Sequence, residues 1–163
     1  MSSFTGTTSI PPSVEVKPGA VSQSYDSLKA GTLDGDGLQA NTQFLAYLDS
    51  SSGSAMTSSV VAVLPLSNTG RAHMPNKRNQ PLIKGHSSAV KDFTFNAFNP
   101  YQLITCSADA YMKLWVIPET GYVDDVTTPE ATWITSGKDP LRGVAFHPSI
   151  AGLVASRSSR RLF

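Results

Sequence analysis

The chain has 163 residues, 40% of them hydrophobic and 15% charged, which is enough for one modest domain with its own core. A net charge of +1, with a mildly basic second part, is well short of the composition of a nucleic-acid-binding domain. The one cysteine, Cys106, excludes an intramolecular disulfide and suits a reducing compartment, and no apolar run reaches the roughly 18 residues of a membrane span.

The N-terminal residues 1–24 are rich in Ser, Thr, Pro and Gly. They hold too few large apolar side chains to offset the loss of chain entropy, so we expect a disordered tail without a secretory signal. The following "GTLDGDG" (31–37) is typical of a turn.

The rest of the chain, residues 25–163, alternates short apolar runs with polar loops, which predicts an all-β fold with a helix content near zero. In the run 90–95 we expect Val90, Asp92 and Thr94 on one face of a strand and the residues between them on the other. The predicted strands are 44–48, 60–66, 90–95, 103–107, 112–117, 132–135, 141–146 and 153–156.

Gly85-His86 and Trp115 have the spacing of a WD repeat, a unit of about 40–45 residues from a four-stranded propeller blade. We expect a buried chain of hydrogen bonds in which Asp109 contacts His86, His86 contacts Thr105, and Thr105 contacts the indole of Trp115. These four residues are therefore predicted to be structural.

A second, weaker copy of the repeat follows. Its residues 143–163 match 92–113, with Phe146 aligned to Phe95 and Leu153 to Leu103. Gly137-Lys138 stands at the place of Gly-His, and Ser159 at the place of the aspartate.

Together these segments predict a partial WD-repeat β-propeller. It consists of a closing outer strand (60–66), a full blade (about 82–121) and a partial blade (about 132–163), and it is incomplete relative to a closed ring of blades. One and a half blades leave both sides bare, so we expect marginal stability or completion by another chain.

The motifs "VVAVLPLSNTGR" (60–71), "LWVIPETG" (114–121) and "VAFHP" (144–148) resemble those of the coronin family. Coronins are actin-binding WD-repeat proteins with a seven-bladed propeller. The resemblance implies a cytoplasmic, cytoskeletal protein that binds filamentous actin, and the segment before "SYDSLK" is more similar to the tandem-propeller type. In the family a basic residue of the Tyr-Asp stretch itself is implicated in actin binding, and in the "YDSLK" of this sequence it corresponds to Lys29.

Other basic residues could also meet an acidic partner such as actin or an anionic lipid. They are the loop residues Arg71, Lys77, Arg78 and Lys84, and the terminal cluster Arg157, Arg160 and Arg161. The default interpretation of each is a solvated surface. A generic WD-repeat scaffold that binds other cytoskeletal or trafficking proteins is the alternative to actin binding.

An enzyme is the least favoured class. A Thr-His-Asp set suggests a hydrolase, but nothing indicates an oxyanion site or a Gly-x-Ser-x-Gly turn. Cys106 fits a strand core better than a nucleophile. The "DGDG" at 34–37 lacks the later acidic ligands of a calcium loop, with Leu45 at the twelfth position, and no histidine spacing suits zinc. We therefore expect no cofactor, no metal and no catalysis.

Overall fold

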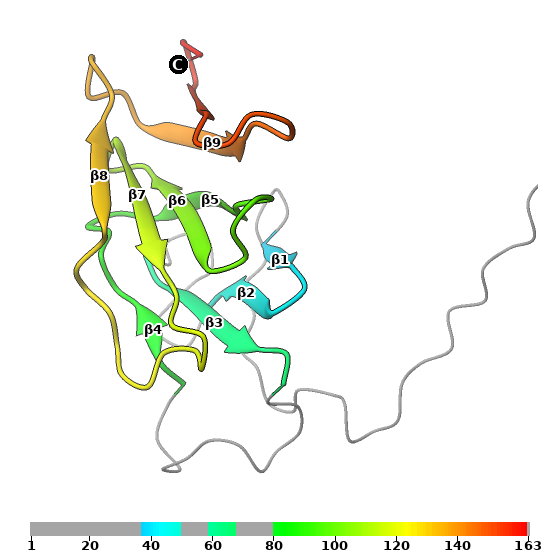
Figure 1. Cartoon of the computed structure of the whole chain (residues 1–163). Helices are drawn as coiled ribbons and strands as arrows, with labels where there is room; N and C mark the ends of the chain where they lie inside the picture. The colour runs from blue at the N-terminus through cyan, green and yellow to red at the C-terminus, as the bar shows by residue number, and fades with distance from the viewer. Residues whose placement is uncertain (1–36, 50–58, 68–79, 163) are drawn as a thin grey trace, which may run out of the picture.

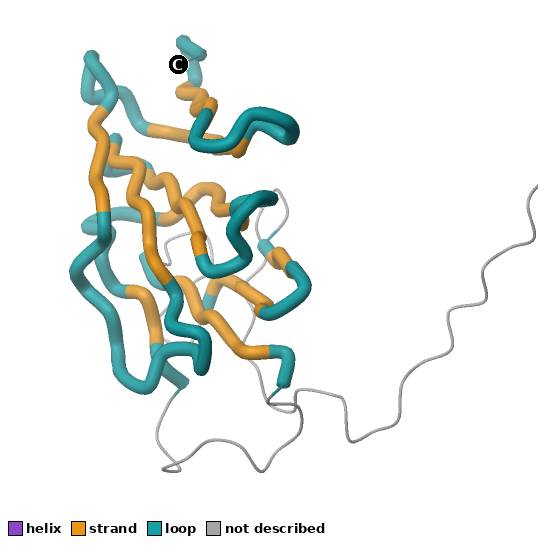
Figure 2. Tube along the Cα trace, in the orientation of Figure 1, coloured by secondary structure: helices purple, strands orange, loops and turns teal. Residues whose placement is uncertain are grey.

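The computed structural model describes residues 37–49, 59–67 and 80–162. These residues form ten antiparallel strands and no helix (Figures 1 and 2), in agreement with the all-β prediction. The disordered tail expected at 1–24, the turn at 31–36 and the loop at 68–79 lie outside the described residues.

Three sheets are present in the part of the chain that the structure describes, and each follows the chain order. The first sheet contains β1 (Leu38–Ala40), β2 (Phe44–Leu48), β3 (Val61–Pro65) and β4 (Leu82–Ile83). The second contains β5 (Val90–Phe95), β6 (Gln102–Ser107), β7 (Tyr111–Val116) and β8 (Ala131–Ile134). The third contains β9 (Leu141–Phe146) and β10 (Val154–Ser158).

The second sheet lies between the other two, as Figure 1 shows. Its strand β6 is buried on both faces, because Leu103 packs toward the first sheet while Ile104 and Cys106 pack against the third. The core between the first and second sheets contains Phe44, Leu48, Val61, Val63, Ile83, Val90, Phe93, Phe95, Leu103, Trp115 and Ile117. Alternation of side chains along a strand is what allows one strand to supply two cores.

The position of one strand corrects the sequence prediction. Residues 60–66 were expected as a closing outer strand, but β3 lies third in a complete four-stranded sheet, between β2 and β4. The outer strand is the two-residue β4, which Lys84 separates from Gly85-His86. The sequence repeat that begins at residue 82 therefore spans two sheets, and its first strand completes the sheet before it.

The start of β5 differs from simple alternation as well. A β-bulge lies between Val90 and Asp92, so Val90 pairs with Ser107 and Asp92 with Cys106. The extra residue, Lys91, places Val90 in the same core as Phe93 and Phe95. The prediction that Val90 shares a face with Asp92 and Thr94 is therefore wrong.

Candidate functional site

The structure brings together the four residues singled out from the WD-repeat pattern. The Trp115 indole Nε1–H donates to Thr105 Oγ1 at 2.9 Å. Thr105 Oγ1 lies 2.7 Å from His86 Nε2, and His86 Nδ1 lies 2.9 Å from Asp109 Oδ2. A continuous chain of hydrogen bonds thus runs from the indole to the carboxylate.

Four different elements position these side chains. Thr105 and Trp115 lie on the neighbouring strands β6 and β7, His86 lies in the loop between β4 and β5, and Asp109 lies in the turn between β6 and β7. Asp109 Oδ2 also accepts the Ser87 N–H at 3.0 Å. This chain of hydrogen bonds therefore connects the loop before the second sheet to the middle of that sheet.

A neutral histidine that carries its proton on Nδ1 satisfies both contacts of the ring. In this tautomer His86 Nδ1–H donates to the Asp109 carboxylate, and His86 Nε2 accepts the Thr105 hydroxyl hydrogen. The Thr105 oxygen is then free to accept the indole N–H. Burial lowers the pKa of His86 below its usual value and outweighs the opposing effect of Asp109, which agrees with this tautomer.

Asp109 itself is ionised at neutral pH. Burial raises its pKa, but the hydrogen bonds from His86, Tyr111 and Ser87 outweigh that effect, and the pKa lies below its usual value. The two side chains are 1% and 5% exposed, so their contact is almost free of competing water.

Three further residues, whose roles the sequence pattern did not indicate, support this chain of hydrogen bonds. Ser107 Oγ accepts the backbone N–H of Asp109 at 3.2 Å, and Lys113 Nζ donates to the Gly85 carbonyl at 2.6 Å. A Cβ at Gly85 would lie 2.3 Å from Trp115 Cη2, so only glycine allows the loop to pass this close to the indole. The Gly-His pair of the WD-repeat pattern is the signal that could have indicated the glycine's role.

The Thr-His-Asp geometry does not suit nucleophilic catalysis. Thr105 is fully buried, and its hydroxyl oxygen already contacts both His86 and Trp115. A substrate carbonyl could not reach it without removal of the indole. What the arrangement can do chemically is to hold two strands and a loop in one geometry.

The structure also locates the other candidates for chemical function, in the part of the chain that it describes. Cys106 is buried in the core between the second and third sheets, and burial raises the pKa of its thiol. Within residues 37–49, 59–67 and 80–162, no three His, Cys, Asp or Glu side chains gather as a metal site. Of the "DGDG" segment, only Gly37 is described.

The predicted actin-binding candidates Lys29, Arg71, Lys77 and Arg78 lie outside the described residues. Of the other basic residues, Lys84 pairs with Asp125 at 2.5 Å on the surface. The cluster Arg157, Arg160 and Arg161 lies on β10 and the turn that follows it.

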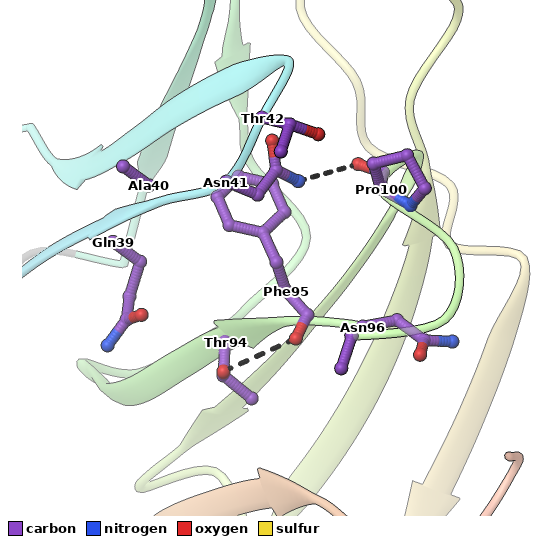
Figure 3. A pocket seen from close by; sticks show the side chains of 9 residues that line it. Gln39, Ala40, Asn41, Thr42, Thr94, Phe95, Asn96 and Pro100 are labelled. Carbon is purple, nitrogen blue, oxygen red and sulfur yellow. Dashed lines mark hydrogen bonds between the residues drawn. The ribbon is translucent and has the colours of Figure 1, made fainter. Parts of the chain in front are cut away.

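An open pocket of about 350 Å³ lies where the turn between β1 and β2 meets the end of β5. Figure 3 shows the Asn41 side chain above Phe95, with its amide Nδ2 donating to the Pro100 carbonyl at 2.8 Å. Asn41 Nδ2 joins the first sheet to the loop after β5, and Asn41 Oδ1 accepts the Phe44 N–H within its own turn. The pocket therefore lies at the junction of the first and second sheets. Among the described residues, no helix is long and apolar enough to cross a membrane.

Comparison with known proteins relates the chain to coronins. A family model described as Domain of unknown function (DUF1899) matches residues 13–71. Villidin from Dictyostelium discoideum is 32% identical over 134 residues, and human coronin-7 is 34% identical over 125 residues. These matches cover 81% and 77% of this chain, but 7% of villidin and 12% of coronin-7.

A solved coronin structure is also similar to this chain. The WD40 domain of Toxoplasma gondii coronin matches with a TM-score of 0.68 and 26% identity, over 82% of this chain and 33% of that chain. The predicted fold, a WD-repeat propeller that is incomplete relative to the full ring, is thereby confirmed. The chain spans only a small part of the length of the relatives that it matches.

Proposed function

Since the chain is a coronin-type WD-repeat sequence, we propose that it is a non-catalytic binding module whose partner is filamentous actin. Such a role places it in the cytoplasm, on the actin cytoskeleton. The relationship with coronins supports this partner, since the family binds actin.

One observation carries the non-catalytic part of this proposal. The single arrangement of catalytic residue types in the described part of the chain, Asp109, His86 and Thr105, is buried and internally satisfied. Its polar groups are used to stabilise a blade, as buried polar groups generally are. We therefore assign function to the surface of the domain, through contacts with other proteins.

Cosedimentation with actin filaments at low salt tests the partner. We expect the chain to pellet with filaments and to be released as salt is raised, since contacts between exposed charges are screened. A chain that stays in the supernatant would favour the alternative, a WD-repeat scaffold for trafficking proteins.

The residue-level part of the proposal assigns the actin contact to Lys29, with Arg71, Lys77 and Arg78 as further candidates. Lys29→Glu should reduce pelleting, whereas Lys17→Glu changes the net charge equally and should have little effect. Equal reductions in both variants would show that overall charge, and not Lys29, determines binding.

A further inference from the structure

The charges of the described residues are divided between the sheets. Up to Gly137 the described residues carry three lysines against seven carboxylates, whereas residues 138–162 carry five basic residues against one carboxylate. Every arginine that the structure describes belongs to the second group. The five basic residues are Lys138, Arg142, Arg157, Arg160 and Arg161, and we refer to them as the arginine surface. All five are exposed.

The residues of the arginine surface are held in place by the third sheet. Ser158 Oγ accepts the backbone N–H groups of Arg160 and Arg161 at 3.2 and 3.0 Å, which fixes the turn after β10. Arg142 at the start of β9 donates from Nε to Ser159 Oγ in the same turn. The loop before β9 and the turn after β10 therefore lie at one end of the sheet.

Gly143 extends this surface along the strands. It pairs with Arg157 across β9 and β10, and a Cβ at Gly143 would lie 2.9 Å from Arg157 Nε. The glycine thus leaves room for the Arg157 side chain to lie across β9. The basic groups therefore lie on the loop before β9, on the two strands and on the turn after β10.

Comparison with the second sheet shows that the contact of Arg161 does not replace the buried pair that holds that blade together. In the second sheet Ser107 Oγ accepts the N–H of Asp109, so the turn after β6 corresponds to the turn after β10. Where the second sheet has the buried pair of His86 and Asp109, the third has Arg161 Nε 3.8 Å from Asp139 Oδ2, with side chains 58% and 27% exposed. The turn of the third sheet is therefore positively charged where the turn of the second sheet is negatively charged, and its ion pair lies on the surface.

We propose that the arginine surface is a docking surface for a carboxylate-rich protein segment. Guanidinium groups bind carboxylates through two parallel hydrogen bonds, and four of the five groups are arginines. Within the protein itself, the carboxylate of Asp139 already lies beside Arg161. An exposed ion pair of this kind is weak, so a carboxylate of a partner can replace that of Asp139. Because these groups are distributed over a loop, two strands and a turn, a protein segment can contact several of them at once, whereas a small anion cannot. This inference is independent of actin as the partner.

Binding of a fluorescently labelled oligo-glutamate peptide to the full chain tests the proposal. We expect binding that weakens with salt, and an affinity about tenfold lower for Arg160→Gln/Arg161→Gln. The control Lys84→Gln/Lys91→Gln removes the same charge from the acidic part of the molecule and should leave the affinity nearly unchanged. Circular dichroism verifies that each variant is folded, which is expected because Ser158 holds the turn through backbone groups.

A third variant separates the guanidinium fork from its charge. Arg160→Lys/Arg161→Lys keeps both charges and should give an intermediate affinity. Absence of peptide binding, or equal weakening by the two glutamine pairs, would overturn the proposal. Tighter binding to phosphatidylserine vesicles through the same arginines would also overturn it, in favour of a lipid headgroup.

Discussion

Thr105 is the residue on which the buried hydrogen-bond chain depends most. Its single hydroxyl group satisfies His86 Nε2 and the Trp115 indole N–H at the same time. A third contact, to the Lys113 carbonyl, is longer at 3.5 Å. Valine at this position would keep the shape and the β-branching of the side chain but could not form a hydrogen bond with His86 Nε2 or Trp115 Nε1.

Thr105→Val should therefore lower the free energy of unfolding by roughly 3 kcal/mol, because two buried groups lose their partner. Urea denaturation followed by tryptophan fluorescence measures the change. Thr132→Val on the exposed β8 is the matched control and should be nearly neutral. Similar losses in the two variants would contradict a special role for the buried hydroxyl.

The protonation of His86 predicts how stability depends on pH. Its folded pKa lies below the ordinary value of 6.5, so below pH 6.5 the unfolded chain binds the proton more strongly than the folded chain. Stability should be complete above this pH and fall as the pH drops toward the lowered folded pKa. The pKa of Asp109, lowered from 3.8, adds a second loss as the pH falls through that more acidic range.

His86→Gln should remove the first of these two losses. The histidines at 73 and 147 are present in both proteins, so the difference between the two stability curves isolates His86. Urea midpoints measured from pH 7.5 down to about pH 5 provide the curves. Parallel curves for the variant and the unchanged chain would show that His86 is not buried in its neutral form.

At the scale of the strands, the sequence predicted the long elements and missed the short ones. Eight of the ten strands lie where apolar runs predicted them, whereas β1 and β4, with three and two residues, are too short to show a period. The bulge at Lys91 is a property of the pairing with β6 and leaves no mark on the sequence pattern.

The predicted alignment of the second repeat with the first was wrong by one residue. Val154, and not Leu153, is opposite Phe146, as Leu103 is opposite Phe95. Two adjacent apolar residues cannot by themselves fix a register with a period of two. The turn residue that corresponds to Asp109 is consequently Arg160, where Ser159 was expected.

The members of the site were predictable where residue type and spacing coincide. His86 and Trp115 carry the motif, and their partners Thr105 and Asp109 follow from the need to satisfy buried polar groups. The contact of Lys113 with the Gly85 carbonyl joins a strand to a loop 28 residues away and depends on the folded geometry alone.

One hydrogen bond joins the second sheet to the third. Asp92 Oδ2 on β5 accepts the backbone N–H of Val144 on β9 at 2.9 Å. In the third sheet the corresponding position is Gly143, so no such carboxylate is repeated there. The attachment of β9 therefore depends on this side chain together with the apolar contacts around Ile104.

Asp92→Ala should loosen the third sheet selectively. Hydrogen exchange measured by mass spectrometry should become faster in peptides from 141–158, while peptides from β6 and β7 change less. Asp92→Asn keeps an acceptor oxygen and should retain most of the protection. Uniformly faster exchange over the whole second sheet would indicate instead that Asp92 stabilises its own sheet.

For the molecule as a whole, the third sheet is the least enclosed of the three. One face of β9 and β10 packs on the second sheet through Leu141 and Val144, while Ala145, Ala155 and Arg157 of the other face are exposed. Blades of a propeller are stabilised by neighbours on both sides, so a sheet covered on one face opens at a lower free energy than the sheets beside it.

Limited proteolysis with trypsin tests the relative stability of the second and third sheets, because each of these two sheets contains its own cleavage sites. Cleavage after Arg142 and Arg157 should precede cleavage after Lys91 and Lys113, since local opening of the third sheet exposes the first two sites. Mass spectrometry of the early fragments identifies the sites. If Asp92 anchors β9, Asp92→Ala should accelerate the two arginine cleavages and leave the two lysine cleavages nearly unchanged. Simultaneous cleavage at all four sites would mean that the sheets open together, as a single cooperative unit in which the exposed face of the third sheet costs no local stability.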